Sequence, residues 1–175
     1  MPNDESRENE WAQLGDEERE VISGLLRFCL QLLVDDGHVQ EDELRSNFHI
    51  AYEGSDRLNS RGLAAATTQD DEGHAVLVVD PALPLDAIIW AIPHEAVHVA
   101  QVCRGDLAFL VRCTQWQGQS YVTLHAEHPD YLMQPWEAEA ARLEHDLRAA
   151  MCSRYQELGH LVTCPPRRPV QGERR

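Results

Sequence analysis

Apolar residues recur every three or four positions in three segments of the chain, which predicts three long helices. The first begins at Asp16, a helix-capping residue, and runs to about Asp36. The second begins near Leu85, is apolar on most sides and is stopped by Gly105, so we expect it to be buried. The third starts near Pro135, because proline suits a first helical turn. Its apolar stripe consists of Trp136, Ala140, Leu143, Leu147, Ala150, Met151 and Leu158.

A different period, alternation of apolar and polar residues, separates the first two helices. It predicts a strand over residues 48–52. Residues 62–69 and 74–79 flank a polar turn and are expected to form a β-hairpin. Residues 109–121 are expected to hold a second, irregular hairpin with Gly118 at its turn. The order of elements predicts the α+β class, with a small antiparallel or mixed sheet.

The length of 175 residues suits one domain with a real core, which we place at residues 15–160. Residues 1–14 are expected to be disordered, and residues 161–175 to form a flexible basic tail rich in proline and arginine. The chain has no apolar run of the length that spans a membrane, and its N-terminus lacks the apolar stretch of a secretory signal. We therefore expect a cytoplasmic protein without a membrane partner, whose five cysteines are reduced.

The formal net charge of -15 changes the list of expected partners. Binding to a nucleic acid depends on neutralising its phosphates, so this charge argues against a nucleic-acid partner. It is compatible with attraction of basic substrates, and equally with a role in solubility alone.

The chemistry is concentrated in the motif HExxH, which the second helix carries as His94, Glu95 and His98. Residues four apart lie on one helix face, so the two imidazoles can bind one metal ion. Two histidines with an intervening glutamate are the core of a zinc-dependent hydrolase, with Glu95 as its general base. Pro93 directly precedes the motif, so the helix either starts afresh there or bends.

A catalytic zinc site usually has three protein ligands, and the third helix offers two carboxylates, Glu137 and Glu139. They are two residues apart and point to different helix faces, so one of them can readily face the zinc. The carboxylate that does not is expected to have a solvated or helix-dipole role.

The stretch from His94 to about Leu147 resembles the gluzincin branch of the zincin metallopeptidases, especially small bacterial and phage zincin-like proteins. Three patterns carry the resemblance. They are HExxHxxQ (His94, Glu95, His98, Gln101), WxGxxY (Trp116, Gly118, Tyr121) and PxExEA (Pro135, Glu137, Glu139, Ala140). In related peptidases of the CAAX prenyl protease and ImmA/IrrE types, the third ligand is the glutamate of an ExxA pattern followed by Asp or Asn. Matched in this way, Glu137 is the favoured ligand and Glu139 the alternative, although Ala141 stands where the polar residue is expected.

The resemblance implies a zincin-like fold, with an active-site helix, a C-terminal ligand helix and an edge strand that binds an extended peptide. Residues 74–79 are our candidate for that strand. The implied activity is that of a zinc metallopeptidase acting on a peptide or protein. The alternative is a zincin-fold metal-binding protein without proteolytic activity, with a binding or assembly role in a phage or toxin system. Candidate donors to the oxyanion or substrate are Tyr131, Tyr121, His125 and His128.

Overall fold

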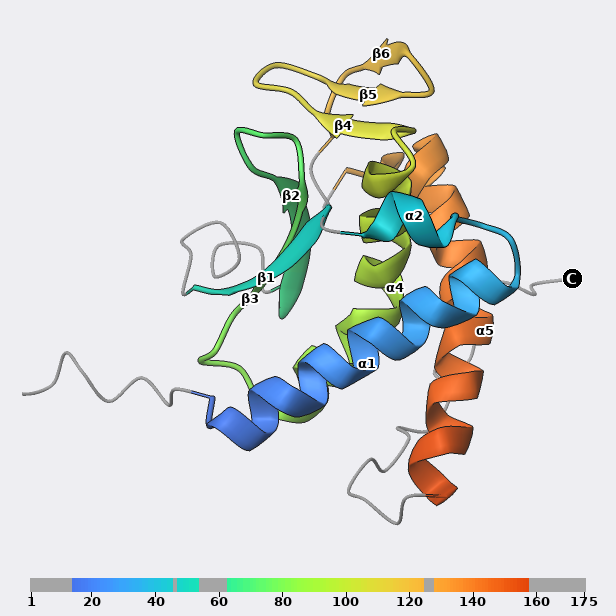
Figure 1. The fold of residues 1–175 in the computed structure, drawn as a ribbon. Helices are drawn as coiled ribbons and strands as arrows, with labels where there is room; N and C mark the ends of the chain where they lie inside the picture. The colour runs from blue at the N-terminus through green and yellow to red at the C-terminus, as the bar shows by residue number, and fades with distance from the viewer. Residues whose placement is uncertain (1–13, 46, 54–62, 125–127, 158–175) are drawn as a thin grey trace, which may run out of the picture.

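A computed structural model describes residues 14–45, 47–53, 63–124 and 128–157 of the chain. The fold is of the α+β class, as predicted (Figure 1). The predictions made for residues 1–13, for Leu158 and for residues 161–175 lie outside the described residues. Leu14, expected to be disordered with the residues before it, is buried in the core instead. In chain order the elements are α1 (Asp16–Asp35), α2 (Glu41–Leu44), β1 (Phe48–Tyr52), β2 (Ala65–Gln69), β3 (Ala75–Val79), α4 (Leu85–Cys103), β4 (Leu107–Phe109), β5 (Thr114–Trp116), β6 (Gln119–Tyr121), the 3-10 helix η2 (Tyr131–Met133) and α5 (Pro135–Glu157).

The first sheet has the strand order β1-β3-β2. The predicted hairpin of β2 and β3 is confirmed, with Ala65 opposite Val79 and Gln69 opposite Ala75. The prediction that residues 74–79 form an edge strand is wrong, because β1 pairs in parallel with the other side of β3. The burial of β3 explains its central place: four of its five residues are buried and all are apolar, as is usual for a strand covered on both faces.

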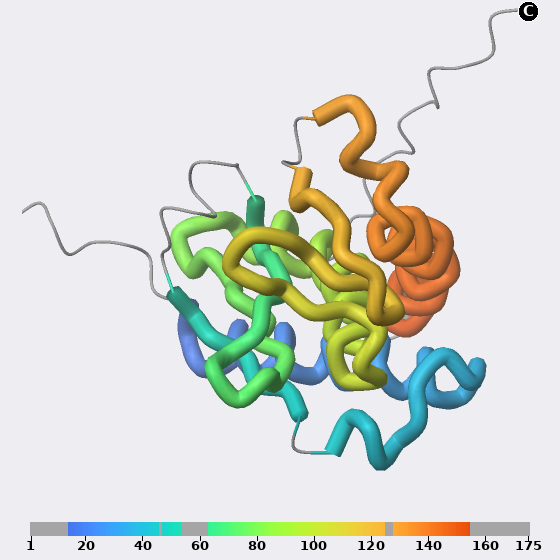
Figure 2. Tube along the Cα trace, turned by 90° about the horizontal axis from the view of Figure 1, so that it is seen from above, coloured from blue at the N-terminus to red at the C-terminus, as the bar shows by residue number. Residues whose placement is uncertain are grey.

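The second sheet is an antiparallel meander of β4, β5 and β6. The predicted turn at Gly118 is confirmed between β5 and β6. Gln117 and Gly118 both have positive φ values, of 48° and 78°, as a tight two-residue hairpin turn requires. In Figure 2, which looks down from above, this sheet lies over the C-terminal end of α4.

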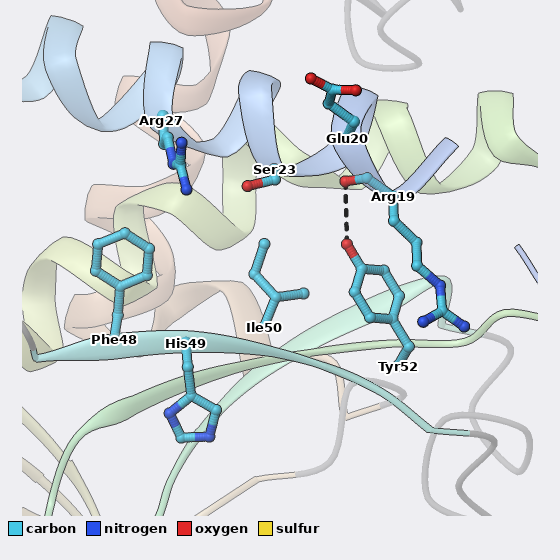
Figure 3. A pocket seen from close by; sticks show the side chains of 8 residues that line it. All are labelled: Arg19, Glu20, Ser23, Arg27, Phe48, His49, Ile50 and Tyr52. Carbon is cyan, nitrogen blue, oxygen red and sulfur yellow. Dashed lines mark hydrogen bonds between the residues drawn. The ribbon is translucent and has the colours of Figure 1, made fainter. Parts of the chain in front are cut away.

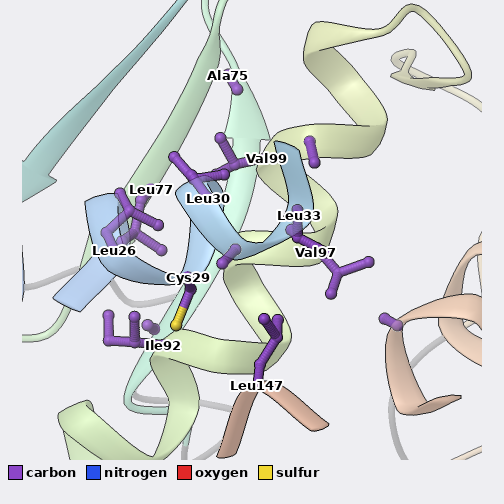
Figure 4. Close-up of a cluster of buried hydrophobic side chains, with 14 of the residues drawn as sticks. Leu26, Cys29, Leu30, Leu33, Ala75, Leu77, Ile92, Val97, Val99 and Leu147 are labelled. Carbon is purple, nitrogen blue, oxygen red and sulfur yellow. The ribbon is translucent and has the colours of Figure 1, made fainter. Parts of the chain in front are cut away.

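The helix α4 lies at the centre of the molecule, between the first sheet and α5, while α1 crosses it (Figure 1). Its core-facing residues, among them Ile92 and Val97, are completely buried. Figure 4 shows how side chains of α1, β3, α4 and α5 meet in this core; the labelled ones include Leu26, Leu77 and Leu147. Burial on several sides fixes α4, and with it the HExxH motif, relative to both neighbours.

Two local expectations are settled by the structure. The HExxH helix neither restarts nor ends at Pro93, because α4 is continuous from Leu85 to Cys103. The expectation of fully reduced cysteines is wrong for Cys152, which is disulfide-bonded, whereas Cys29, Cys103 and Cys113 are free thiols.

Among the described helices, none has the length and apolar character needed to cross a membrane.

Candidate metal centre

The helix α4 presents His94 and His98 on one face, as their four-residue spacing requires. Their Nε2 atoms are 3.0 Å apart, and the two rings meet edge to face. His98 is 5% exposed, and the side chain of His94 is 21% exposed. The pair therefore lies at the margin of the core, with one ring closed off from solvent and one ring partly accessible.

Glu137, in the first turn of α5, completes the group. Its Oε2 is 3.3 Å from Nε2 of His94, and its Oε1 is 3.5 Å from Nε2 of His98. One ligand atom from each of the three residues lies within 4.8 Å of the others. In the part of the chain that the structure describes, this is the one group of three potential ligands with this spacing.

The outer nitrogen of His94 contacts a second carboxylate of α5. Nδ1 of His94 is 2.9 Å from Oε2 of Glu144. Arg148 lies 3.3 Å from the same carboxylate, and its guanidinium stacks on the ring of Trp90. A carboxylate in this place orients the ring of His94 and increases the basicity of its inner nitrogen.

The outer nitrogen of His98 contacts a neutral amide instead. Both hydrogens of the Gln101 Nε2 group are directed to acceptors, the carbonyl of Trp136 at 3.0 Å and the carboxylate of Glu139 at 2.8 Å. The other end of the amide, Oε1, must therefore accept a hydrogen from Nδ1 of His98, at 2.7 Å. This assignment leaves Nε2 of neutral His98 with a lone pair directed toward Glu137.

Glu139 lies outside the ligand group. Besides its bond to Gln101, it forms an ion pair with Arg104 at the end of α4. Its direction, away from the two histidines, follows from its two-residue separation from Glu137. The expected solvated or helix-dipole role does not describe Glu139, because its carboxylate bonds Gln101 and Arg104. The carboxylate that contacts His94 is Glu144.

The group fits a cation. If Glu144 and Gln101 each accept a hydrogen from an Nδ1 atom, both inner nitrogens carry lone pairs, which face each other and a carboxylate. Oε2 of Glu137 is also buried without a hydrogen bond of good geometry. The two Nε2 atoms and the Glu137 oxygens are then all hydrogen-bond acceptors, with no donor hydrogen between them. A set of acceptors that converge in this way is what a metal ion requires.

The pKa values show the same demand for positive charge. Burial disfavours a charged imidazole, but hydrogen bonds to Glu137 and Glu144 and the charge of Glu95 outweigh it and raise the pKa of His94 to about 10. Burial likewise opposes ionisation of Glu137, but its bonds to the two histidines hold its pKa far below the usual value. The carboxylates around the two inner nitrogens therefore favour a positive charge there, whether a proton or a metal ion supplies it.

Glu95 follows His94 on α4, but its partner is on the first sheet and not on α5. Its Oε2 accepts a hydrogen bond from the hydroxyl of Thr67 on β2, at 2.9 Å. Glu95 as a residue is 8% exposed, and its bond to Thr67 joins the motif helix to the first sheet. It follows His94 in the sequence without being part of the ligand group.

The predicted oxyanion donors differ in their positions. Tyr131, in η2, makes a side-chain hydrogen bond to Glu137 that helps to lower the pKa of that carboxyl. Tyr121 packs edge to face on Trp136, 5.6 Å between ring centres, and its hydroxyl donates to Gln119. Nδ1 of His128 accepts a hydrogen bond from the backbone N–H of Asp130, and His125 lies outside the described residues. Of the three candidates that the structure describes, Tyr131 is the one that forms a hydrogen bond to the ligand group.

A groove of about 450 Å³ between α1 and β1 is a separate feature (Figure 3). None of its lining residues belongs to the His94, His98 and Glu137 group. The hydroxyl of Tyr52, one of its lining residues, donates a hydrogen bond to the carbonyl of Arg19 at 3.2 Å. The groove has volume but lacks a converging set of ligands, so we assign the chemistry to the ligand group.

Comparisons with protein-family models, with curated proteins and with solved structures find no match to this chain. The evidence for function is therefore the geometry of its own residues. Sequence reasoning missed two of them, Glu144 and Thr67. Glu144 could have been found, because it is seven residues after Glu137 and so lies on the same face of a regular helix. Thr67 carried no such signal, since its contact with α4 depends on long-range packing.

Proposed function

We propose that this chain is a zinc-dependent peptidase of the zincin type, with His94, His98 and Glu137 as metal ligands. The observation that carries the proposal is the convergence of these three side chains within 4.8 Å, with Glu95 beside them. Two imidazoles and one carboxylate are a ligand set of catalytic zinc sites that leave a position open. The HExxHxxQ and PxExEA patterns, with a buried motif helix packed on α5, support the gluzincin branch and a zincin-like fold.

A zinc ion held by this group would polarise a peptide carbonyl and make a water molecule a better nucleophile. The residues of the chain supply the remaining steps. Glu95 accepts the proton of the attacking water and passes it to the leaving amine. Glu144 and Gln101 hold the two ligand rings in orientation, and Tyr131 lies next to Glu137, from where it is our candidate donor to the oxyanion.

Because β3 is the central strand, the peptide-binding edge in this proposal is β2. Among the described residues, β2 pairs with β3 on one side only, and it carries Thr67 to the carboxylate of Glu95. An extended peptide that adds its backbone to the free side of β2 would lie alongside α4. The substrate class is therefore a peptide or protein in extended conformation.

The test is Glu95→Gln, compared with the parent on a broad peptide library. The variant should fold and bind zinc like the parent, because Glu95 is not a ligand. Its rate of hydrolysis should fall by at least about 100-fold, because the amide cannot accept a proton. Glu53→Gln, a change at an exposed position, is the matched control and should keep the parent rate.

Two results would contradict the proposal. A Glu95→Gln variant that cleaves peptides at the parent rate would remove Glu95 from the reaction. A parent that binds zinc but cleaves nothing in the library would favour the alternative, a zincin-fold metal-binding protein with a binding or assembly role.

A further inference from the structure

Thr67 is a polar residue in a position where β2 faces the helix α4. Its side chain is on the buried face of the strand, and the residue is 9% exposed. Its Oγ1 lies 2.9 Å from Oε2 of Glu95 and 3.2 Å from the backbone carbonyl of the same residue. Both acceptors belong to the residue between the two ligand histidines in the HExxH motif.

The hydroxyl has a single hydrogen, so it donates to one of these acceptors at a time. The carboxylate is closer and carries a charge, and hydrogen bonds to charged acceptors are stronger than bonds to neutral carbonyls. The contact therefore restrains Glu95 through one oxygen of its carboxylate, Oε2.

We propose that Thr67 is a positioning residue that holds Glu95 in the orientation for proton transfer. The inference rests on the proposed function, because it gives a role to a residue around the same site. A hydrogen bond from the strand restricts the rotamers of a carboxylate on the helix, and rates of proton transfer depend on that geometry. The simpler alternative is that Thr67 donates to the backbone carbonyl and only joins β2 to α4.

The first experiment measures kcat and KM for four zinc-loaded proteins on a peptide that the parent cleaves. Thr67→Val removes the hydroxyl at nearly constant shape and should lower kcat by about 10- to 100-fold, the usual effect of losing such a supporting partner, with little change in KM. Thr67→Ser keeps the hydroxyl and should stay close to the parent. Thr68→Val makes the same change at the next residue of β2, which points to the other side of the strand, and should have no effect.

The second experiment does not require turnover. Acetohydroxamate binds zinc through its two oxygens and presents a hydrogen to the neighbouring carboxylate, so its affinity reports the orientation of Glu95. Calorimetric titration of the zinc-loaded parent, Thr67→Val, Glu95→Gln and the double variant forms a double-mutant cycle. Each single change should weaken binding by about 10-fold, and the double variant should be no weaker than Glu95→Gln alone.

The outcomes separate this inference from the proposed function. Coupled losses of acetohydroxamate affinity without peptide cleavage would support the positioning role and contradict the peptidase. Peptide cleavage with unchanged kcat in Thr67→Val, or losses that multiply in the double variant, would overturn the positioning role alone. If Thr67→Val does not fold, the comparison of Thr67→Ala with Thr67→Ser decides in the same way, because equal values would show that the hydroxyl is not needed.

Discussion

The two histidines of the candidate metal centre have hydrogen-bond partners of different charge. His94 contacts the carboxylate of Glu144, and His98 contacts the amide of Gln101. The carboxylate strengthens its imidazole as a ligand, whereas the amide mainly fixes the tautomer and the ring plane. Because Gln101 also bonds the first turn of α5 through Trp136, the same side chain that orients His98 ties the two ligand helices together.

Replacement of single carboxylates in α5 tests the assignment of the third ligand. Glu137→Ala should weaken zinc binding by at least about 100-fold, because it removes one of three ligands and leaves two histidines facing an empty space. Glu139→Ala is the matched control on the adjacent face, where Glu139 contacts Arg104 and Gln101, and should change the affinity much less. Titration of both variants against a competing chelator measures the difference.

The reverse order of affinities would move the ligand assignment to Glu139. Equal and negligible losses in both variants would remove α5 from the metal site.

At the scale of elements, the predictable part of the structure is the part with strong local patterns. The apolar stripe of residues 135–157, the HExxH helix and the β2–β3 hairpin are all encoded by residues close together in sequence. The two carboxylates of α5 could be sorted by helix geometry, which predicted that Glu137 and Glu139 face different ways.

The unpredicted part depends on contacts distant in sequence. Nothing local in β1 or β3 specifies that they pair in parallel, and this pairing makes β3 central instead of an edge strand. Thr67 likewise reaches Glu95 across 28 positions in the chain. The grouping of His94, His98 and Glu137 could thus be predicted from the sequence, whereas the contact between Thr67 and Glu95 could not.

The role of α4 as the central element gives a prediction for stability. Ile92, two residues before the motif, is completely buried in the core. Ile92→Ala should lower the free energy of unfolding by about 2–5 kcal/mol, because it removes buried carbon atoms and leaves a cavity. Val111→Ala, at a fully exposed position, should change it by less than about 0.5 kcal/mol. Urea denaturation measures both, and similar values for the two variants would contradict the central packing of α4.

For the whole molecule, the candidate metal centre lies where two parts of the fold meet. Two of its proposed ligands are on α4, which packs on the first sheet and α1, and the third is on α5. A metal ion at this place would join α5 to the rest of the fold, so binding free energy would contribute to folding. The formal net charge of -15 makes added positive charge in the buried group favourable for the molecule as a whole.

The most direct test of the account is the zinc content of the purified protein, measured by elemental analysis beside the His98→Ala variant. We predict about one zinc ion per chain in the parent and little or none in the variant. The variant lacks one of the three proposed ligands, and His98 is the more buried of the two histidines. A correctly folded parent that takes up no zinc, or a His98→Ala variant that retains as much zinc as the parent, would contradict the assignment of this group as a metal centre.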